Sequence, residues 1–505
     1  MPFLRASITS ESAIAGSVYL ALMVLFNSLE WKMGGYRSLL LVMMLAFTFT
    51  AFLISHTDIQ VGCTRRRSGY SPSPRSPSAN LTFGCIVVLA LVPIVDAVLS
   101  LGGRYHVRVL GDAIISIVIL ASGLDARPRR RAPTMLMPTV LLIALLLPLS
   151  NFVSGLIVPK LEDIATTTVT AATALWSGRN PYAMYIDILG AASVHNLAFG
   201  GYKYLPLMIL TYAPFVATLG KHGILWANIL FYSGTLVAVF ALARRLSTTW
   251  CGFPVLLFVS SFILSADALA MGTNDIAALL PILGAFLLWP NRPGLVGLLI
   301  GVSLCMKPFP GIVAATLLVP SQRKDRSPYM AGIVIALLPA LVFFLWAPRQ
   351  FTNNIILFNL VRPVDPTTWR YGTPNFLGAL AAMTGLGVWM GLTLWCLRVR
   401  AELRSRLYAF VIVVICVLLA GPTDRDNYAM WWAPILAVLI STFDFRRTAA
   451  RVRNSGNLDA DERRLRGCGN HGSSPTRLQK NAMLSGRVHS GQSEALPATG
   501  NESGA

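Results

Sequence analysis

Two carboxylates, Glu162 and Asp163, stand directly after a long apolar stretch. They precede the turn-forming run SGRNPY (177–182) and, about twenty residues later, YKYLPL (202–207). A carboxylate at the mouth of a membrane bundle can act as a general base, taking the proton from an attacking hydroxyl group. Acids in the first turn of a helix also interact favourably with the helix dipole without any catalytic role, so a purely structural interpretation stays open.

A lysine interrupts a second apolar stretch. Lys307 lies in GVSLCMKPFPG (301–311), beside Pro308 and Pro310. A charge inside a membrane span is costly, which makes it a functional hypothesis by default. The prolines predict a break into two half-helices with Lys307 near the outer surface. The alternative is a lysine whose ammonium reaches the interface from a helix end.

The elements that must position these residues are membrane helices. The chain is 54% hydrophobic and 13% charged over 505 residues, with a mean hydropathy of +0.61. Since a helix needs about 20 apolar residues to cross a bilayer, the sequence predicts an all-α polytopic bundle with about 11 to 13 crossings. We expect N-terminal helices over 1–131 (four spans), a catalytic bundle over 132–445 and a disordered basic tail over 446–505. The first span lacks a convincing cleavage site and is expected to be retained.

The net charge of +20 indicates topology rather than nucleic-acid binding. The basic clusters lie in short loops and in the tail, which places these loops and both termini in the cytoplasm and 159–203 outside. With these loops assigned, the number of crossings between 204 and 274 is consistent only if 253–271 enters the membrane and returns to the same side. This arrangement leaves Arg244 and Arg245 outside. The cysteines form no CxxC or His/Cys cluster, so metal ligation by cysteine is not expected.

The outer segment after residue 158 predicts a helix lying along the membrane surface. The Gly178 turn is expected to end it. Asn274 and Asp275 open a later span after Gly272, either as N-cap and first-turn acid or as substrate contacts. One side of the surface helix carries Leu161, Ala165, Thr168, Ala172, Leu175 and Trp176.

Four motifs in order resemble the polytopic GT-C glycosyltransferases, and most closely glycosyltransferase family 87. The resemblance covers about 135–444 and departs from the family at Leu205, where a proline is usual, and in the four N-terminal spans. The motifs are Asp163 with LWSGRNPY (175–182), YKYLPL (202–207), MGTNDIAALLPILGA (271–285) and GLLIGVSLCMKPFPGIVAATLLVP (297–320).

The resemblance implies an inverting transferase of the inner (plasma) membrane. It would move mannose, or another hexose or pentose, from a polyprenyl-phosphate donor to a glycolipid or glycan acceptor on the outer face. Asp163 matches the family's base, with Glu162 beside it. No cofactor is required by this chemistry, although the acidic pair could hold a divalent cation. Candidate ligands of the donor phosphate are Lys307, Lys203, Arg179 and Arg370, and candidate substrate contacts are Tyr182, Tyr204, Asn274, Asp275 and Arg425.

Two other functions stay open. A flippase for lipid-linked glycans would use the same cations without chemistry, but the paired broken helices of transporters are not evident. A polysaccharide polymerase or ligase would instead use the outer loop 348–375, with Arg362 and Arg370. Walker A and Rossmann fingerprints are absent from the sequence, which agrees with a lipid-linked donor rather than a nucleotide sugar.

Overall fold

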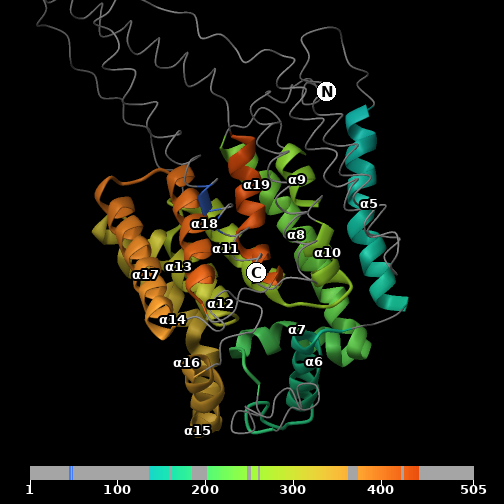
Figure 1. Cartoon of the computed structure of the whole chain (residues 1–505). Coiled ribbons are helices and arrows are strands. Elements are labelled where there is room, and N and C mark those ends of the chain that lie inside the picture. Colours follow the sequence, from blue (N-terminus) through green and yellow to red (C-terminus); the bar gives the residue numbers. More distant parts are fainter. Residues whose placement is uncertain are drawn as a thin grey trace, which may run out of the picture.

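The computed structural model describes residues 136–157, 161–184, 202–246, 252–259, 262–361, 374–421 and 426–442, together with positions 42, 45, 46 and 48. The regular elements of these described residues are all helical (Figure 1). The predicted N-terminal spans, the basic tail and the domain boundaries at 131 and 445 lie outside the described residues. The all-α class is confirmed.

The helices run in chain order through the bundle. They are α5 (Leu136–Ile157), α6 (Asp163–Trp176), α7 (Pro206–Leu219), η4 (Gly220–His222), α8 (Gly223–Arg245), α9 (Gly252–Val259), α10 (Phe262–Leu269), α11 (Asp275–Leu288), α12 (Pro293–Leu304), α13 (Pro308–Leu317), α14 (Arg323–Trp346), α15 (Pro348–Phe351), η5 (Thr352–Leu357, a π-helix), α16 (Phe358–Val361), α17 (Asn375–Arg398), α18 (Leu403–Ala420), η6 (Asp426–Trp431) and α19 (Ala433–Ser441).

Four stretches of the described residues are long and apolar enough to cross a membrane: 206–245, α14, α17 and α18. Helices α14 and α17 leave large apolar side chains such as Val342, Leu345 and Met383 exposed. In a membrane these side chains would face lipid, whose tails are as apolar as leucine. The helices therefore support the prediction of an integral membrane protein.

The path between 204 and 274 differs from the prediction. Helix α7 lies across one end of the bundle (Figure 1), because the Leu207 N–H donates to the Cys305 carbonyl and the Tyr212 hydroxyl to Asn228 near the start of α8. Helix α8 then runs to the opposite end, and α9 and α10 follow one another back. The structure thus has α9 and α10 running back through the bundle where the sequence predicted a dip at 253–271.

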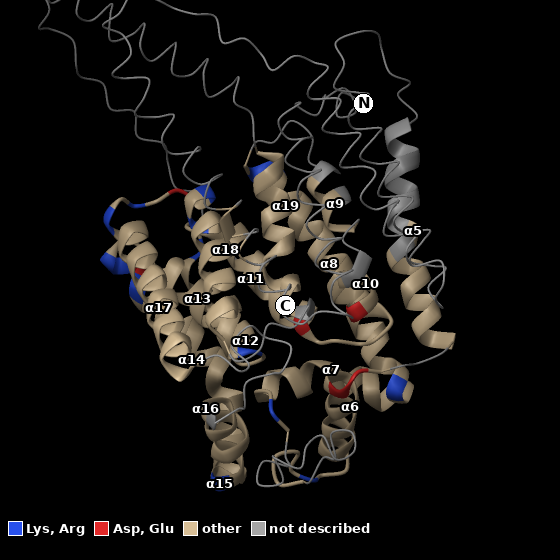
Figure 2. Ribbon diagram, in the orientation of Figure 1, with Lys and Arg blue, Asp and Glu red and all other residues tan. Residues whose placement is uncertain are grey.

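The far end of the bundle is held by arginines. Arg245 donates to the carbonyls of Phe286, Leu287 and Trp289 at the end of α11. Arg406, fully buried, donates to the carbonyls of Leu317, Cys396 and Ala401, which lie at or just beyond the ends of α13 and α17. The last carbonyls of a helix lack intrahelical partners, and a cation there also complements the dipole. We call this the arginine end; Figure 2 shows basic residues around it on α17 and α18.

Helices α12 and α14 touch backbone to backbone. A Cβ added at Gly297 would lie 1.9 Å from the Tyr329 carbonyl oxygen, and one at Gly332 would lie 2.3 Å from the Gly294 oxygen. Small residues allow this approach, as is common between membrane helices. The glycine seam (Gly294, Gly297, Gly301 and Gly332) fixes α12, and with it the break that carries Lys307.

Candidate active site

The predicted break at Lys307 is present. Lys307 is the N-cap residue of α13 and separates it from α12. Its ammonium donates to Asp275 Oδ1 at 2.5 Å, and the two side chains are 6% and 0% exposed. Sequence reasoning singled out both residues but did not pair them. Burying the Lys307 ammonium without a counter-charge would cost several kcal/mol, and Asp275 supplies that counter-charge. Lys307 is therefore already paired and does not offer a free positive charge to a phosphate.

Aromatic rings enclose this ion pair. The Lys307 ammonium lies 5.0 Å from the ring centroid of Tyr204, 5.7 Å from that of Trp431 and 6.0 Å from that of Tyr428. Tyr428 and Trp431 stack with centroids 4.6 Å apart. Ring faces attract a cation at these separations. We call Tyr204, Asp275, Lys307, Tyr428 and Trp431 the lysine cluster.

Asp163 begins α6 with its carboxylate facing the helix N-terminus. Its Oδ1 accepts from the Ile164 N–H at 2.7 Å, and the residue is half-buried. Burial raises the pKa of the Tyr204 hydroxyl well above 10, and Tyr428, Asp275, Tyr202 and Asp163 raise it further, in that order. Among these causes, Asp275 acts on the Tyr204 hydroxyl more strongly than Asp163 does.

Two hydrogen bonds hold the start of α6 against the start of α11. The Glu162 N–H donates to the Met271 carbonyl at 3.0 Å. Asn274 occupies the N-cap position of α11 as predicted, but its side chain does not cap the helix. Its Nδ2 instead donates to Thr168 Oγ1 on α6 at 3.2 Å, and that hydroxyl meets the Tyr202 hydroxyl at 3.2 Å. Gly272, at φ +79°, gives the turn the close approach to Ala165 that these links require.

The SGRNPY turn ends α6 as predicted. Gly178 has φ +71°, its N–H donates to the Leu175 carbonyl, and the Arg179 N–H donates to the Ala174 carbonyl, which is a Schellman motif. The buried Tyr182 then donates its hydroxyl to the Tyr204 carbonyl at 2.7 Å. Tyr182 thus positions Tyr204.

The predicted apolar side of α6 is largely correct. Ala165, Thr168 and Ala172 are buried. Trp176 is 62% exposed, because its indole reaches over α7 and donates to the Ala213 carbonyl at 2.7 Å. Arg179 is exposed beyond the far end of α6, about 20 Å from Asp163 along the helix.

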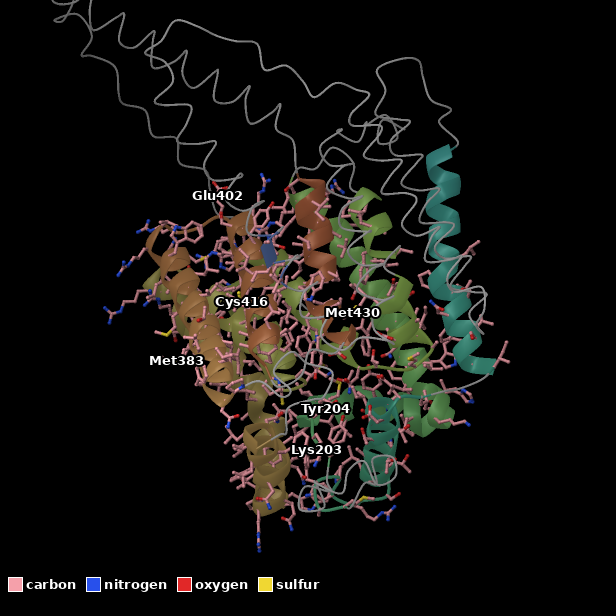
Figure 3. The ribbon with its side chains drawn as sticks, in the orientation of Figure 1. Lys203, Tyr204, Met383, Glu402, Cys416 and Met430 are labelled. Atoms are coloured by element: carbon pink, nitrogen blue, oxygen red, sulfur yellow. The ribbon has the colours of Figure 1, made fainter. Side chains whose placement is uncertain are left out.

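Lys203 faces a different neighbour from Tyr204. Figure 3 shows the two labelled side by side below the bundle. The Lys203 ammonium donates to Asn354 Oδ1 at 3.4 Å and lies 4.4 Å from the Phe358 ring centroid. Partial burial lowers the pKa of Lys203 from its ordinary value of 10.5 to about 8.

The structure thus brings together Tyr204, Asn274, Asp275 and Lys307, with Asp163 and Glu162 at the edge. It does not bring Arg179 there, and the side chains of Arg370 and Arg425 lie outside the described residues. Tyr428 and Trp431 were not among the predicted site residues, because tyrosine and tryptophan are common at membrane interfaces whatever their role. Within the described residues no group of three or more His, Cys, Asp or Glu side chains could hold a metal ion.

Comparison with known proteins adds a family. Residues 202–442 match the model of glycosyltransferase family 87. The match contains the whole lysine cluster, whereas Asp163 and α6 precede it. Curated proteins and solved structures give no match. The chain is thus similar to this family over 202–442, and the match supports a membrane glycosyltransferase.

Proposed function

We propose that the protein transfers a sugar from a polyprenyl-phosphate donor to a glycolipid or glycan acceptor, with inversion and with Asp163 as general base. The observation that carries the proposal is the position of this half-buried carboxylate at the start of α6. Hydrogen bonds from Glu162 to Met271 and from Asn274 to Thr168 hold this helix against the start of α11, which contributes Asp275 to the lysine cluster. A base must lie close to both the acceptor hydroxyl and the donor. Mannose is the sugar to test first, since the sequence resembles mannosyl-type enzymes.

The charges of the arginine end support an orientation of the protein in the membrane. Lysines and arginines accumulate on the cytoplasmic side of membrane proteins. With α8 crossing once, Arg244 and Arg245 join the basic residues of that end, which removes the exception that the predicted dip created. The Asp163 end is then the outer face, where a lipid-linked donor would be used. The basic residues of the arginine end are Arg244, Arg245, Arg292, Arg323, Lys324, Arg326, Arg398, Arg400, Arg404 and Arg406.

The donor phosphate needs a cation as its charge develops during departure. Lys203 is the candidate that we favour, because Asp275 already neutralises the Lys307 ammonium. Asp163 would take the acceptor proton while the phosphate leaves from the opposite face of the sugar. This division of roles requires no metal ion, although a cation on the acidic pair stays a hypothesis.

The test is Asp163→Asn in membranes supplied with labelled polyprenyl-phosphate mannose and an acceptor extract. Loss of a general base is expected to lower the rate of transfer about 100-fold or more. Asp325→Asn is the matched control, because Asp325 is also a first-turn acid but begins α14 at the arginine end. Glu162→Gln should give a smaller loss.

Unchanged transfer by Asp163→Asn would remove the base assignment. A flippase would behave differently from a transferase: lipid-linked sugar would cross liposome membranes without change, and Asp163→Asn would not affect the crossing.

A further inference from the structure

Two buried polar atoms beside the lysine cluster have no hydrogen-bond partner among the described residues. They are Asn274 Oδ1 and Trp431 Nε1, on residues that are 0% and 4% exposed. Most buried polar atoms in proteins are paired, so each exception needs a reason such as a bound ligand. Asn274 precedes Asp275 directly, and the Trp431 ring lies 5.7 Å from the Lys307 ammonium. The two atoms therefore flank one ion pair.

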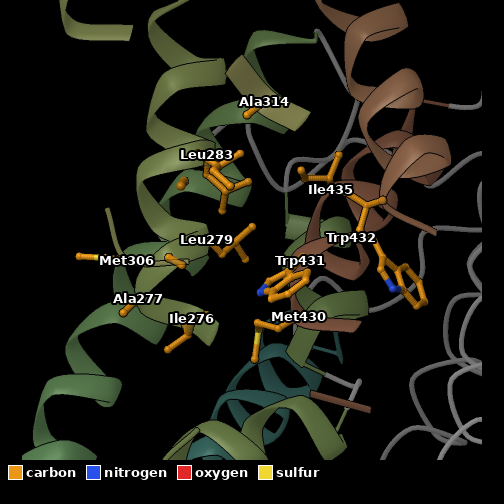
Figure 4. Packing of buried hydrophobic residues seen from close by; sticks show 14 of the residues in the cluster. Ile276, Ala277, Leu279, Leu283, Met306, Ala314, Met430, Trp431, Trp432 and Ile435 are labelled. Carbon is orange, nitrogen blue, oxygen red and sulfur yellow. The ribbon is translucent and has the colours of Figure 1, made fainter. Parts of the chain in front are cut away.

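The orientation of Trp431 sets it apart from its neighbour. Figure 4 shows the Trp431 indole, nitrogen foremost, turned toward α11 and Met306, whereas Trp432 is turned to the other side. Phe309 packs against Trp431 with ring centroids 5.4 Å apart, and Tyr428 stacks on it. Two rings therefore pack against the indole, whose ring centroid lies 5.7 Å from the Lys307 ammonium.

The chemistry of these groups selects a class of ligand. Lys307 and Asp275 together carry no net charge, so the cluster offers no excess cation to a phosphate. The unpaired atoms are one acceptor and one donor, and aromatic rings surround the Lys307 ammonium beside them. A sugar ring presents hydroxyl groups that both donate and accept, and C–H faces that pack on aromatic rings. A phosphate, which only accepts, would leave Asn274 Oδ1 unpaired.

We propose that the lysine cluster, with Asn274, is the subsite for the sugar ring of the donor, and that Trp431 and Asn274 are its specificity-determining residues. This inference rests on the proposed function. The donor sugar is favoured over the acceptor because the base that meets the acceptor comes from α6, whereas this subsite is built from α11, η6 and the α12–α13 break. Lys307 and Asp275 position the subsite, and the phosphate lies nearer Lys203.

The test compares binding of two lipids that differ only in the sugar. Purified full-length protein is titrated with polyprenyl-phosphate mannose, glucose and arabinose, and with bare polyprenyl phosphate of the same chain length. Trp431→Phe keeps the ring and removes the N–H, and should weaken binding of the preferred sugar lipid about tenfold, as one buried hydrogen bond is lost. Binding of polyprenyl phosphate should stay within twofold. Trp432→Phe is the matched control and should leave both affinities unchanged.

Asn274→Ala provides a second variant should Trp431→Phe fold poorly, with the same selective loss expected. Equal weakening of both lipids, or of neither, by the variant that folds would overturn the sugar assignment. If the wild-type protein bound none of the lipids, the proposed donor class itself would fail, which separates the two ideas.

Discussion

Lys307 and Arg406 are both buried cations, but they have different kinds of hydrogen-bond acceptor. The Arg406 guanidinium donates hydrogen bonds to three backbone carbonyls and lies 4.4 Å from the centroid of the Trp289 ring. Lys307 is held by a single carboxylate and by rings, next to polar atoms without partners among the described residues. The guanidinium suits the fixed fan of carbonyls at helix ends, because its five N–H groups are planar and always charged.

The difference separates a structural cation from a functional one. At the arginine end the acceptors are helix carbonyls that need a donor whatever the protein does. At the Asp163 end a carboxylate and a lysine have been buried together, which seldom stabilises a protein more than apolar side chains of the same volume would. A feature that adds little stability and leaves neighbours unsatisfied points to a ligand.

The largest effect is expected from breaking the ion pair on one side. Asp275→Ala would leave the Lys307 ammonium buried without a counter-charge and should lower the free energy of unfolding by about 3 to 5 kcal/mol. Thermal unfolding in detergent measures this loss. The double variant Asp275→Leu with Lys307→Met should recover most of the stability but not the transfer activity. Recovery of both would make the pair merely structural.

Arg406→Lys tests the other side of the comparison. A lysine ammonium cannot reach all three carbonyls, so the free energy of unfolding should fall by about 2 kcal/mol. Transfer per folded molecule should not change, because Arg406 lies at the opposite end from Asp163. A variant of normal stability with impaired transfer would contradict the division between the two ends.

The smallest effect concerns the pH dependence of Lys203. Because burial lowers its pKa to about 8, its charge is present below pH 8 and lost above it. If this charge holds the donor phosphate, KM for the donor should rise by up to about tenfold between pH 7 and 9, and Lys203→Arg should flatten the profile. The unfolded chain binds more protons than the folded one between about pH 8 and 10.5, so this lysine makes stability rise with pH over that window. A KM that stays constant from pH 7 to 9 would exclude Lys203 from phosphate binding.

Local features were predictable from the sequence where short-range rules decide them. The break at Lys307 follows from the flanking prolines, and the turn at Gly178 from glycine's freedom at positive φ. The buried side of α6 follows from its helical period. Trp176 is the exception: its side chain is exposed, and its indole N–H donates to a carbonyl on α7.

The missing parts depend on contacts between distant segments. Helix α7 is apolar throughout, so hydropathy alone cannot distinguish a crossing from a helix that lies across the bundle. The Asp275–Lys307 pair joins residues 32 positions apart. Opposite charges in two neighbouring spans were a usable signal, since charges inside a membrane tend to pair with one another. The approach of Tyr428 and Trp431 left no such signal, because interfacial aromatics have the same composition.

The glycine seam between α12 and α14 has a consequence for how a long lipid enters. Where the main chains of two helices touch without intervening side chains, no side chain can change its rotamer to separate the helices. The α12–α14 contact therefore holds the proposed sugar-binding groups at the break in a fixed position. Entry of a prenyl tail would then require movement of helices other than α12 and α14.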